Sequence, residues 1–190
     1  MKLWRNIRNV INNRKDIPYF HNNTVANRAI NKAANKIPLG TGYESLVLLD
    51  NSTLEIYGPY SDEKSTAVKF PSEIRSLLKK NIQGKYYTVI HNHPSGRAFS
   101  LQDMLIFLRY KHLILSIVIG EDHKNGLIRY YVILKTGADP WFIDNLVERV
   151  EEECTKDNSI RRQSYRFLLD KFNVTFEDLG LEIEAFTREV

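Results

Sequence analysis

The sequence predicts an α+β domain in which a mixed β-sheet is flanked by helices, with helical extensions at both ends. The middle of the chain alternates short β-branched and aromatic runs with two helical patterns, which is typical of such a core. Residues before 38 and after 139 instead place apolar side chains three and four apart, as amphipathic helices do. With 190 residues and 43% hydrophobic side chains, the chain can bury one core of ordinary size plus extra helices.

A basic N-terminal arm is predicted over residues 1–38. One helix is expected over 2–13, and a second begins at Asn23 or Thr24, which are both good N-caps, and ends at Pro38. The arm holds eight lysines and arginines but one aspartate, in a chain whose formal net charge is +4. Three interpretations stay open: helices packed on the core, contact with an acidic partner or nucleic acid, and contact with a membrane surface.

The core is predicted over residues 39–137. Runs rich in β-branched and aromatic residues between turn signals are expected to form strands, and segments that open with proline or a capping residue are expected to form helices. The expected strands are 44–49, 53–57, 86–90, 113–119 and 127–134, and the expected helices are 71–81 and 101–110. These elements make one sheet with helices beside it.

A helical C-terminal extension is predicted over residues 138–190. Asp139 followed by Pro140 is a typical helix start, because an N-cap precedes a proline whose missing N–H is not needed there. A second helix is expected over 159–172, and Thr175 is expected to open a third.

Composition narrows the classes of protein that the chain can belong to. Cys154 is the single cysteine, so an internal disulfide is excluded and a reducing cytosol is favoured. No apolar run approaches the roughly 20 residues of a membrane span. The first residues lack the apolar region of a secretion signal. We therefore expect a cytoplasmic protein without a transmembrane segment.

The most informative stretch is residues 91–103, where two histidines stand two apart and an aspartate follows ten residues later. Catalytic zinc is usually bound by three protein ligands and keeps a fourth position open. Two imidazoles and one carboxylate are such a set. His91, His93 and Asp103 are therefore predicted to bind Zn²⁺.

The local pattern around these residues supports that prediction. A strand is expected to lead into the histidines, and its period of two points His91 and His93 to the same side. Ser100 is a typical helix N-cap, and Asp103 falls in the first turn of the helix that it opens. The alternative is that Ser100 and Asp103 form a plain capping box, which needs no metal.

These motifs resemble those of the JAMM (JAB/MPN-type) zinc metalloproteases over roughly residues 40 to 135. The resemblance rests on the HNHP string at 91–94, the SLQD string at 100–103 and Glu44 upstream. The longer string HNHPSG is most similar to the bacterial RadC-type branch, and Phe99 before the serine resembles JAB-domain proteins of phages and mobile elements. The resemblance implies a cytidine-deaminase-like JAB/MPN core.

The resemblance also implies roles for individual residues. Glu44 is expected to be the general base, with Glu55 and Glu73 as its rivals. Ser100 is expected to help hold the oxyanion of the tetrahedral intermediate. Asn92 is expected to face away from the metal and to fix the loop, while His112 and His123 are expected to be bystanders.

The function implied is a zinc-dependent peptidase or isopeptidase that hydrolyses an amide bond in a peptide or protein, such as one joined to a ubiquitin-like tail. A RadC-like DNA-associated protein or a non-catalytic JAB-fold scaffold is the alternative. The letters of residues 91–93 also suit an HNH nuclease. An apolar strand follows the motif helix in place of the expected finger, which argues against that third function.

Overall fold

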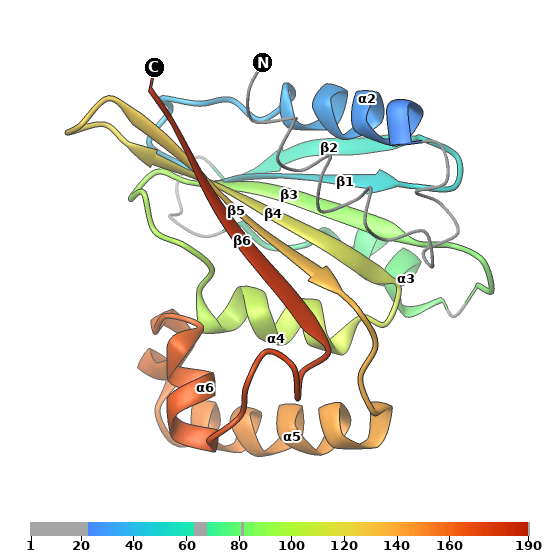
Figure 1. Cartoon of the computed structure of the whole chain (residues 1–190), viewed down its shortest axis with the longest axis vertical. Helices are drawn as coiled ribbons and strands as arrows, with labels where there is room; N and C mark the ends of the chain where they lie inside the picture. The colour runs from blue at the N-terminus through green and yellow to red at the C-terminus, as the bar shows by residue number, and fades with distance from the viewer. Residues whose placement is uncertain (1–22, 63–67, 81, 190) are drawn as a thin grey trace.

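The structure is a computed structural model that describes residues 23–62, 68–80 and 82–189. In these residues it has one six-stranded mixed sheet in the order β2-β1-β3-β4-β5-β6, with helices on both faces (Figure 1). This confirms the predicted class, an α+β protein with a mixed sheet flanked by helices. Its strands are β1 (Ser45–Asp50), β2 (Ile56–Ser61), β3 (Tyr87–His93), β4 (Leu113–Asp122), β5 (Leu127–Lys135) and β6 (Leu181–Glu189).

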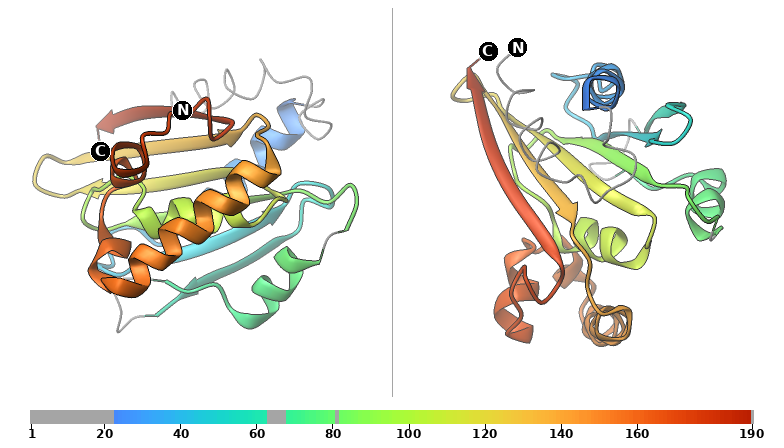
Figure 2. Two further views of the ribbon diagram at one scale, coloured as in Figure 1. Left: turned by 90° about the horizontal axis from the view of Figure 1, so that it is seen from below. Right: turned by 45° about the vertical axis from the view of Figure 1, so that its right-hand side comes forward.

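The helices lie on opposite sides of this sheet, with α2 on one face and α4, α5 and α6 on the other (Figure 2). Their bounds are α2 (Asn23–Ala34), α3 (Ser72–Lys79), α4 (Leu101–Arg109), α5 (Pro140–Lys156) and α6 (Arg166–Phe172), with a 3₁₀ turn η2 (Asn158–Arg162) before α6. Strands β3 and β4 are parallel and the other pairs are antiparallel. A parallel pair needs a crossover, and α4 supplies it.

Strand β1 shows how the two faces are buried. Its side chains alternate, so Leu46 and Leu48 pack with α4 and α5, while Val47 and Leu49 pack with α2. All six of its residues are buried, which explains why residues 46–49 are a continuous apolar run without polar alternation.

The C-terminal extension differs from the prediction. No third helix begins at Thr175 in the described chain. Instead Thr175 and Asp178 close a turn, and residues 181–189 form β6, which pairs with β5 along its whole length. The segment from Leu181 to Ala185 alternates apolar and polar residues, and that period of two is the signal of a strand. The predicted helix over 159–172 is likewise divided into η2 and α6.

The returning strand of the first hairpin is also shifted. It was expected over 53–57, with a loop from Gly58 onward, but β2 runs from Ile56 to Ser61. Asp50 explains the shift, because its carboxylate accepts hydrogen bonds from Ser52 and Thr53 and holds those residues in a turn.

Only part of the basic arm can be described. Helix α2 buries Ala26, Ala29, Ile30 and Ala33 against the sheet, so this half of the arm is a component of the core. The helix expected over 2–13 and His21 lie outside the described residues. Among the described helices, none has the length and apolar character needed to cross a membrane.

Candidate metal centre

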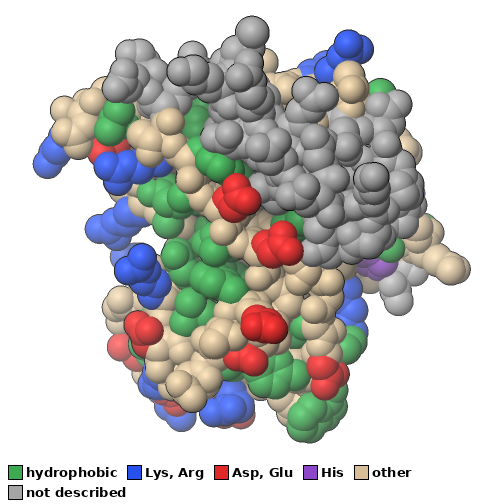
Figure 3. Space-filling model, in the orientation of Figure 1, with side chains coloured by type: hydrophobic (Ala, Val, Ile, Leu, Met, Phe, Trp, Pro, Cys, Tyr) green, Lys and Arg blue, Asp and Glu red, His purple; other side chains and the backbone are tan. Residues whose placement is uncertain are grey.

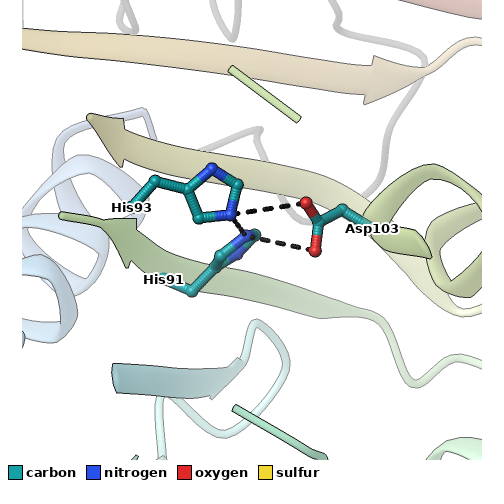
Figure 4. A group of neighbouring side chains, drawn as sticks. All are labelled: His91, His93 and Asp103. Carbon is teal, nitrogen blue, oxygen red and sulfur yellow. Dashed lines mark hydrogen bonds and ion pairs between the residues drawn. The ribbon is translucent and has the colours of Figure 1, made fainter. Parts of the chain in front are cut away.

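The structure brings His91, His93 and Asp103 together, although they come from two elements (Figure 4). His91 and His93 lie at the end of β3, and Asp103 lies in the first turn of α4. Nε2 of His91 is 3.2 Å from Nε2 of His93. Each of these nitrogens is 3.4 Å from a carboxylate oxygen of Asp103.

These separations suit a small cation between the three side chains. In a tetrahedral site with bonds of about 2.0–2.1 Å, neighbouring ligand atoms lie about 3.3 Å apart. The observed 3.2 and 3.4 Å match that edge length without any movement of the backbone. His91 and His93 are buried, and Asp103 is 20% exposed in its side chain, so the site is shielded yet reachable.

The two histidines are held differently. Nδ1 of His93 contacts the carbonyl oxygens of Arg97 and Ala98 at 3.1 and 3.0 Å, so it carries the proton and leaves Nε2 free as a ligand. Nδ1 of His91 is buried and has no hydrogen-bond partner. His93 is therefore the ligand whose tautomer is fixed by the loop that follows it.

Asp103 serves the helix and the site at once. Its Oδ2 accepts hydrogen bonds from the backbone N–H of Ser100 at 2.7 Å and from the Ser100 hydroxyl at 2.6 Å. The Ser100 hydroxyl in turn accepts from the Asp103 N–H at 3.2 Å, which completes a capping box. Oδ1 faces His91. Asp103 can therefore cap the helix through Oδ2 and still offer Oδ1 to a metal ion.

The loop between the histidines and the helix is packed directly on the sheet. Gly96 has φ +70, a conformation that favours glycine, and it lies against Gly120 of β4. A Cβ atom on Gly120 would stand 2.9 Å from the carbonyl oxygen of Gly96. The missing side chain at Gly120 therefore lets the loop approach β4 and brings Ser100 to the strand end.

The side chains of the site shift one another's pKa values. Burial disfavours a charge on His93, but the hydrogen bond and the attraction of Asp103 outweigh it and raise the pKa of the imidazole. Burial also opposes the charge on Asp103, yet the two histidines hold the pKa of its carboxyl well below its ordinary value. Asp103 is therefore an anion, the form that binds a metal.

Glu44 lies beside the three ligands. It immediately precedes β1, its Oε1 is 3.8 Å from Nε2 of His93, and its Oε2 accepts a hydrogen bond from the N–H of Val68 at 3.2 Å. Burial raises the pKa of its carboxyl, against the attraction of His93 and His91. A carboxylate beside a metal position is a candidate general base, and a raised pKa makes it a stronger proton acceptor.

The rivals of Glu44 have other partners. Glu55 is exposed, and its Oε2 accepts a hydrogen bond from the hydroxyl of Tyr57 at 2.8 Å. Glu73 lies in the first turn of α3 and hydrogen-bonds with Tyr60. Among the described acids other than Asp103, Glu44 is the one with an ion-pair contact to His93.

Asn92 faces away from the metal position, as expected, and its contacts extend further than the sequence indicated. Its Oδ1 accepts from the N–H of Ser45 at 2.7 Å, and its Nδ2 donates to the carbonyl oxygen of Tyr43 at 3.2 Å and to Oε1 of Glu121 at 2.7 Å. Asn92 is thus bonded on both sides of Glu44. Glu121 was not predicted, because nothing in its local sequence marks a buried acid 29 positions from its partner.

The two other described histidines, His112 and His123, are outside the three-ligand group. His112 precedes β4 at the opposite end of β3, where its carbonyl oxygen accepts a hydrogen bond from the N–H of Tyr87. His123 is 3.7 Å from Glu121. In the described part of the chain, neither belongs to the His91, His93 and Asp103 group.

Comparison of the chain with protein-family models, with curated proteins and with solved structures finds no match. The sheet and the three converging ligands are therefore the observations from which a function can be argued. They show a partly buried group of two histidines and one aspartate that could hold a metal ion.

Proposed function

We propose that the protein is a zinc-dependent hydrolase of amide bonds, a peptidase or isopeptidase of the JAMM type. The observation that carries the proposal is the position of Glu44, whose Oε1 lies 3.8 Å from Nε2 of His93 beside a set of three ligands. Three protein ligands with a neighbouring carboxylate are the usual composition of a hydrolytic zinc site, whereas structural zinc usually has four protein ligands.

His91, His93 and Asp103 would hold the zinc ion. When bound, zinc supplies Lewis acidity and lowers the pKa of a water molecule at the site to about 7. Oε1 of Glu44, which faces His93, would take a proton from the attacking water and deliver it to the leaving amine. The hydrogen bond that Glu44 accepts from Val68 fixes one oxygen and leaves the other directed toward the histidines.

Ser100 is proposed to assist at the carbonyl oxygen of the substrate. Its hydroxyl lies at the start of α4, next to Asp103, and donates to Oδ2 of that residue in the absence of substrate. Turning this O–H toward a developing oxyanion would leave the backbone N–H of Ser100 to hold Asp103. Loss of one such donor commonly lowers the rate about 100- to 1,000-fold.

The substrate class proposed is a peptide or protein segment in extended conformation. A cavity of about 450 Å³ lies next to Val68, the residue that binds Glu44, and it includes Tyr60 and Ser61 of β2. Strand β2 is at the edge of the described sheet, so an extended peptide can pair with it. The cytoplasm is the proposed compartment, in keeping with the single cysteine.

The alternative of a DNA-associated protein has less support in the described residues. Figure 3 shows acidic and basic side chains mixed over the region of α5 and α6, without a surface of one sign there. Glu151 pairs with Arg109 at 2.7 Å and Glu153 pairs with Lys156 at 2.7 Å, so these cations are largely neutralised. A polyanion is bound by a cluster of unpaired positive charge.

The test compares Glu44→Gln with Glu55→Gln in full-length, zinc-loaded protein. Both variants are assayed on a mixed library of quenched fluorescent peptides and on ubiquitin-like chains joined through lysine. Glu44→Gln should keep one zinc and lose cleavage, because an amide cannot accept the proton. Glu55→Gln should cleave like the natural protein. Equal activity of the two variants, or no cleavage of any substrate by zinc-loaded natural protein, would reject the proposal.

A further inference from the structure

A second cavity lies at the end of the sheet opposite to the metal centre. It has a volume of about 410 Å³ and is lined by residues at the starts of β3 and α5 and in the stretch from Lys135 to Ala138, which leads from β5 to α5. Tyr86 lines it, and His93 is seven residues further along β3, so the two sites are about 20 Å apart. The volume is within the usual range of ligand pockets, about 300–1,000 Å³.

The wall of this cavity is mainly apolar. Its apolar lining includes Leu108, Ile114, Pro140, Ile143 and Leu179. The charged residues that line it are Lys135, Lys111 and Asp144. Lys111 and Asp144 are 3.8 Å apart and more than half exposed, so they lie at its rim as a solvated pair.

Lys135 is the charged group in the wall itself. It is half-buried, its Nζ donates to the carbonyl oxygen of Tyr110 at 2.8 Å, and it lies 4.8 Å over the ring of Phe107. An ammonium group has three donors, and Tyr110 supplies the one oxygen acceptor that the described residues give it. Burial, and then the charge of Lys111, lower the pKa of the Lys135 amine to about 7.

We propose that this cavity binds a small organic carboxylate with an apolar body, whose head group accepts hydrogen bonds from Nζ of Lys135. The apolar wall would cover the body of such a ligand, and the carboxylate would supply acceptors for the two donors that Tyr110 leaves free. The charges of Lys111 and Asp144 at the rim cancel. The positive charge of Lys135 therefore favours a negatively charged ligand. This binding activity is independent of the proposed hydrolysis, because none of its residues belongs to the metal centre.

The charge of the ligand has a measurable consequence. An anion beside Lys135 favours the charged amine, so its pKa should rise on binding. Above pH 7 the complex should therefore take up a proton from the buffer. The other titratable groups around this lysine are Lys111, Asp144 and Tyr86, with His112 packed edge-on against the ring of Tyr86.

The experiment is calorimetric titration of full-length protein with octanoate at pH 8, in two buffers with different enthalpies of ionisation. We expect saturable binding with uptake of most of one proton, and at least about tenfold weaker binding of octanol, which has no charge. Lys135→Met should weaken octanoate binding at least about tenfold and abolish proton uptake. The rim variant Lys111→Met and the neighbour variant His112→Gln should both keep the uptake.

Several results would overturn the proposal. These are the absence of octanoate binding, equal affinity for octanoate and octanol, and proton uptake that persists in Lys135→Met or disappears in His112→Gln. If Lys135→Met does not fold, Lys135→Gln is used in its place. The comparison of octanoate with octanol on the natural protein is decisive without any variant.

Discussion

The amide of Asn92 donates a 2.7 Å hydrogen bond to the carboxylate of Glu121, and both side chains are buried. The same amide is bonded to Tyr43 and Ser45, the two neighbours of Glu44. The residue between the two histidines thus fixes the backbone on either side of the proposed base. The position of Glu44 relative to the two histidines therefore depends on hydrogen bonds of the protein interior.

Asn92→Ala should lower the free energy of unfolding by about 3 kcal/mol, because two buried polar groups and one part-buried carbonyl oxygen lose their partner. Urea denaturation measures the change. Asn125→Ala is the matched control: Asn125 is exposed and donates to Asp122, so its loss should change stability by no more than about 0.5 kcal/mol. Similar small effects for both variants would show that the Asn92 network does not stabilise the fold.

Asp103→Asn should separate the two roles of this side chain. The amide oxygen can still accept from Ser100, so the helix cap remains, but the negative charge that binds a metal is lost. Elemental analysis of the purified natural protein should find about one zinc per chain, and the variant should have almost none. Asp178→Asn changes the same kind of capping box at Thr175 and should leave the zinc content unchanged. If Asp103→Asn still contained about one zinc per chain, Asp103 would act only as a helix cap.

Ser100→Ala should lower the free energy of unfolding by about 1 kcal/mol, since it removes an N-cap side chain. For a protein of this size, that corresponds to a decrease in Tm of about 2–4 °C. Thr175→Ala should have a comparable thermal effect, because Thr175 accepts from Asp178 in the same geometry. Only Ser100→Ala should also reduce cleavage. If both variants lost activity, the loss would be explained by reduced stability and not by a role of Ser100 in the reaction.

The lowered pKa of Lys135 should make the free energy of unfolding depend on pH above neutrality. Because burial lowers the pKa of this amine to about 7, the unfolded chain binds a proton that the folded chain lacks between about pH 7 and the ordinary lysine range. The free energy of unfolding should therefore rise from pH 7 to pH 9. Urea denaturation should show that Lys135→Met removes this rise, while Lys124→Met on the exposed β4–β5 turn retains it.

Features that are encoded locally were predicted from the sequence. The period of two in β3 and the capping box of α4 each depend on residues within a few positions of one another, and together they placed the histidines beside Asp103. The buried face of α2 is another example, since Ala26, Ala29 and Ala33 recur at helical spacing.

Features that depend on distant residues were not predicted. Glu121 becomes a partner of Asn92 only when β3 and β4 lie side by side, and no short-range pattern indicates this. Strand β6 was missed for a different reason. Thr175 followed three residues later by Asp178 is typical of a helix start, but here the pair closes a turn, and the alternation that begins at Leu181 is the signal of the strand.

Gly96 lies in the loop that follows His93, and its contact with Gly120 is between main-chain atoms. The distance between this histidine loop and β4 therefore depends on the backbone alone. Gly120 pairs with His93 across the two strands, so one side-chain methyl there would act directly on the strand end that presents a ligand. Where a residue faces other side chains, a substitution can be absorbed by shifts of those side chains. At Gly120 the nearest atoms are backbone atoms of Gly96, so no side chain can move aside. Even a change from glycine to alanine would have to displace the backbone of the histidine loop.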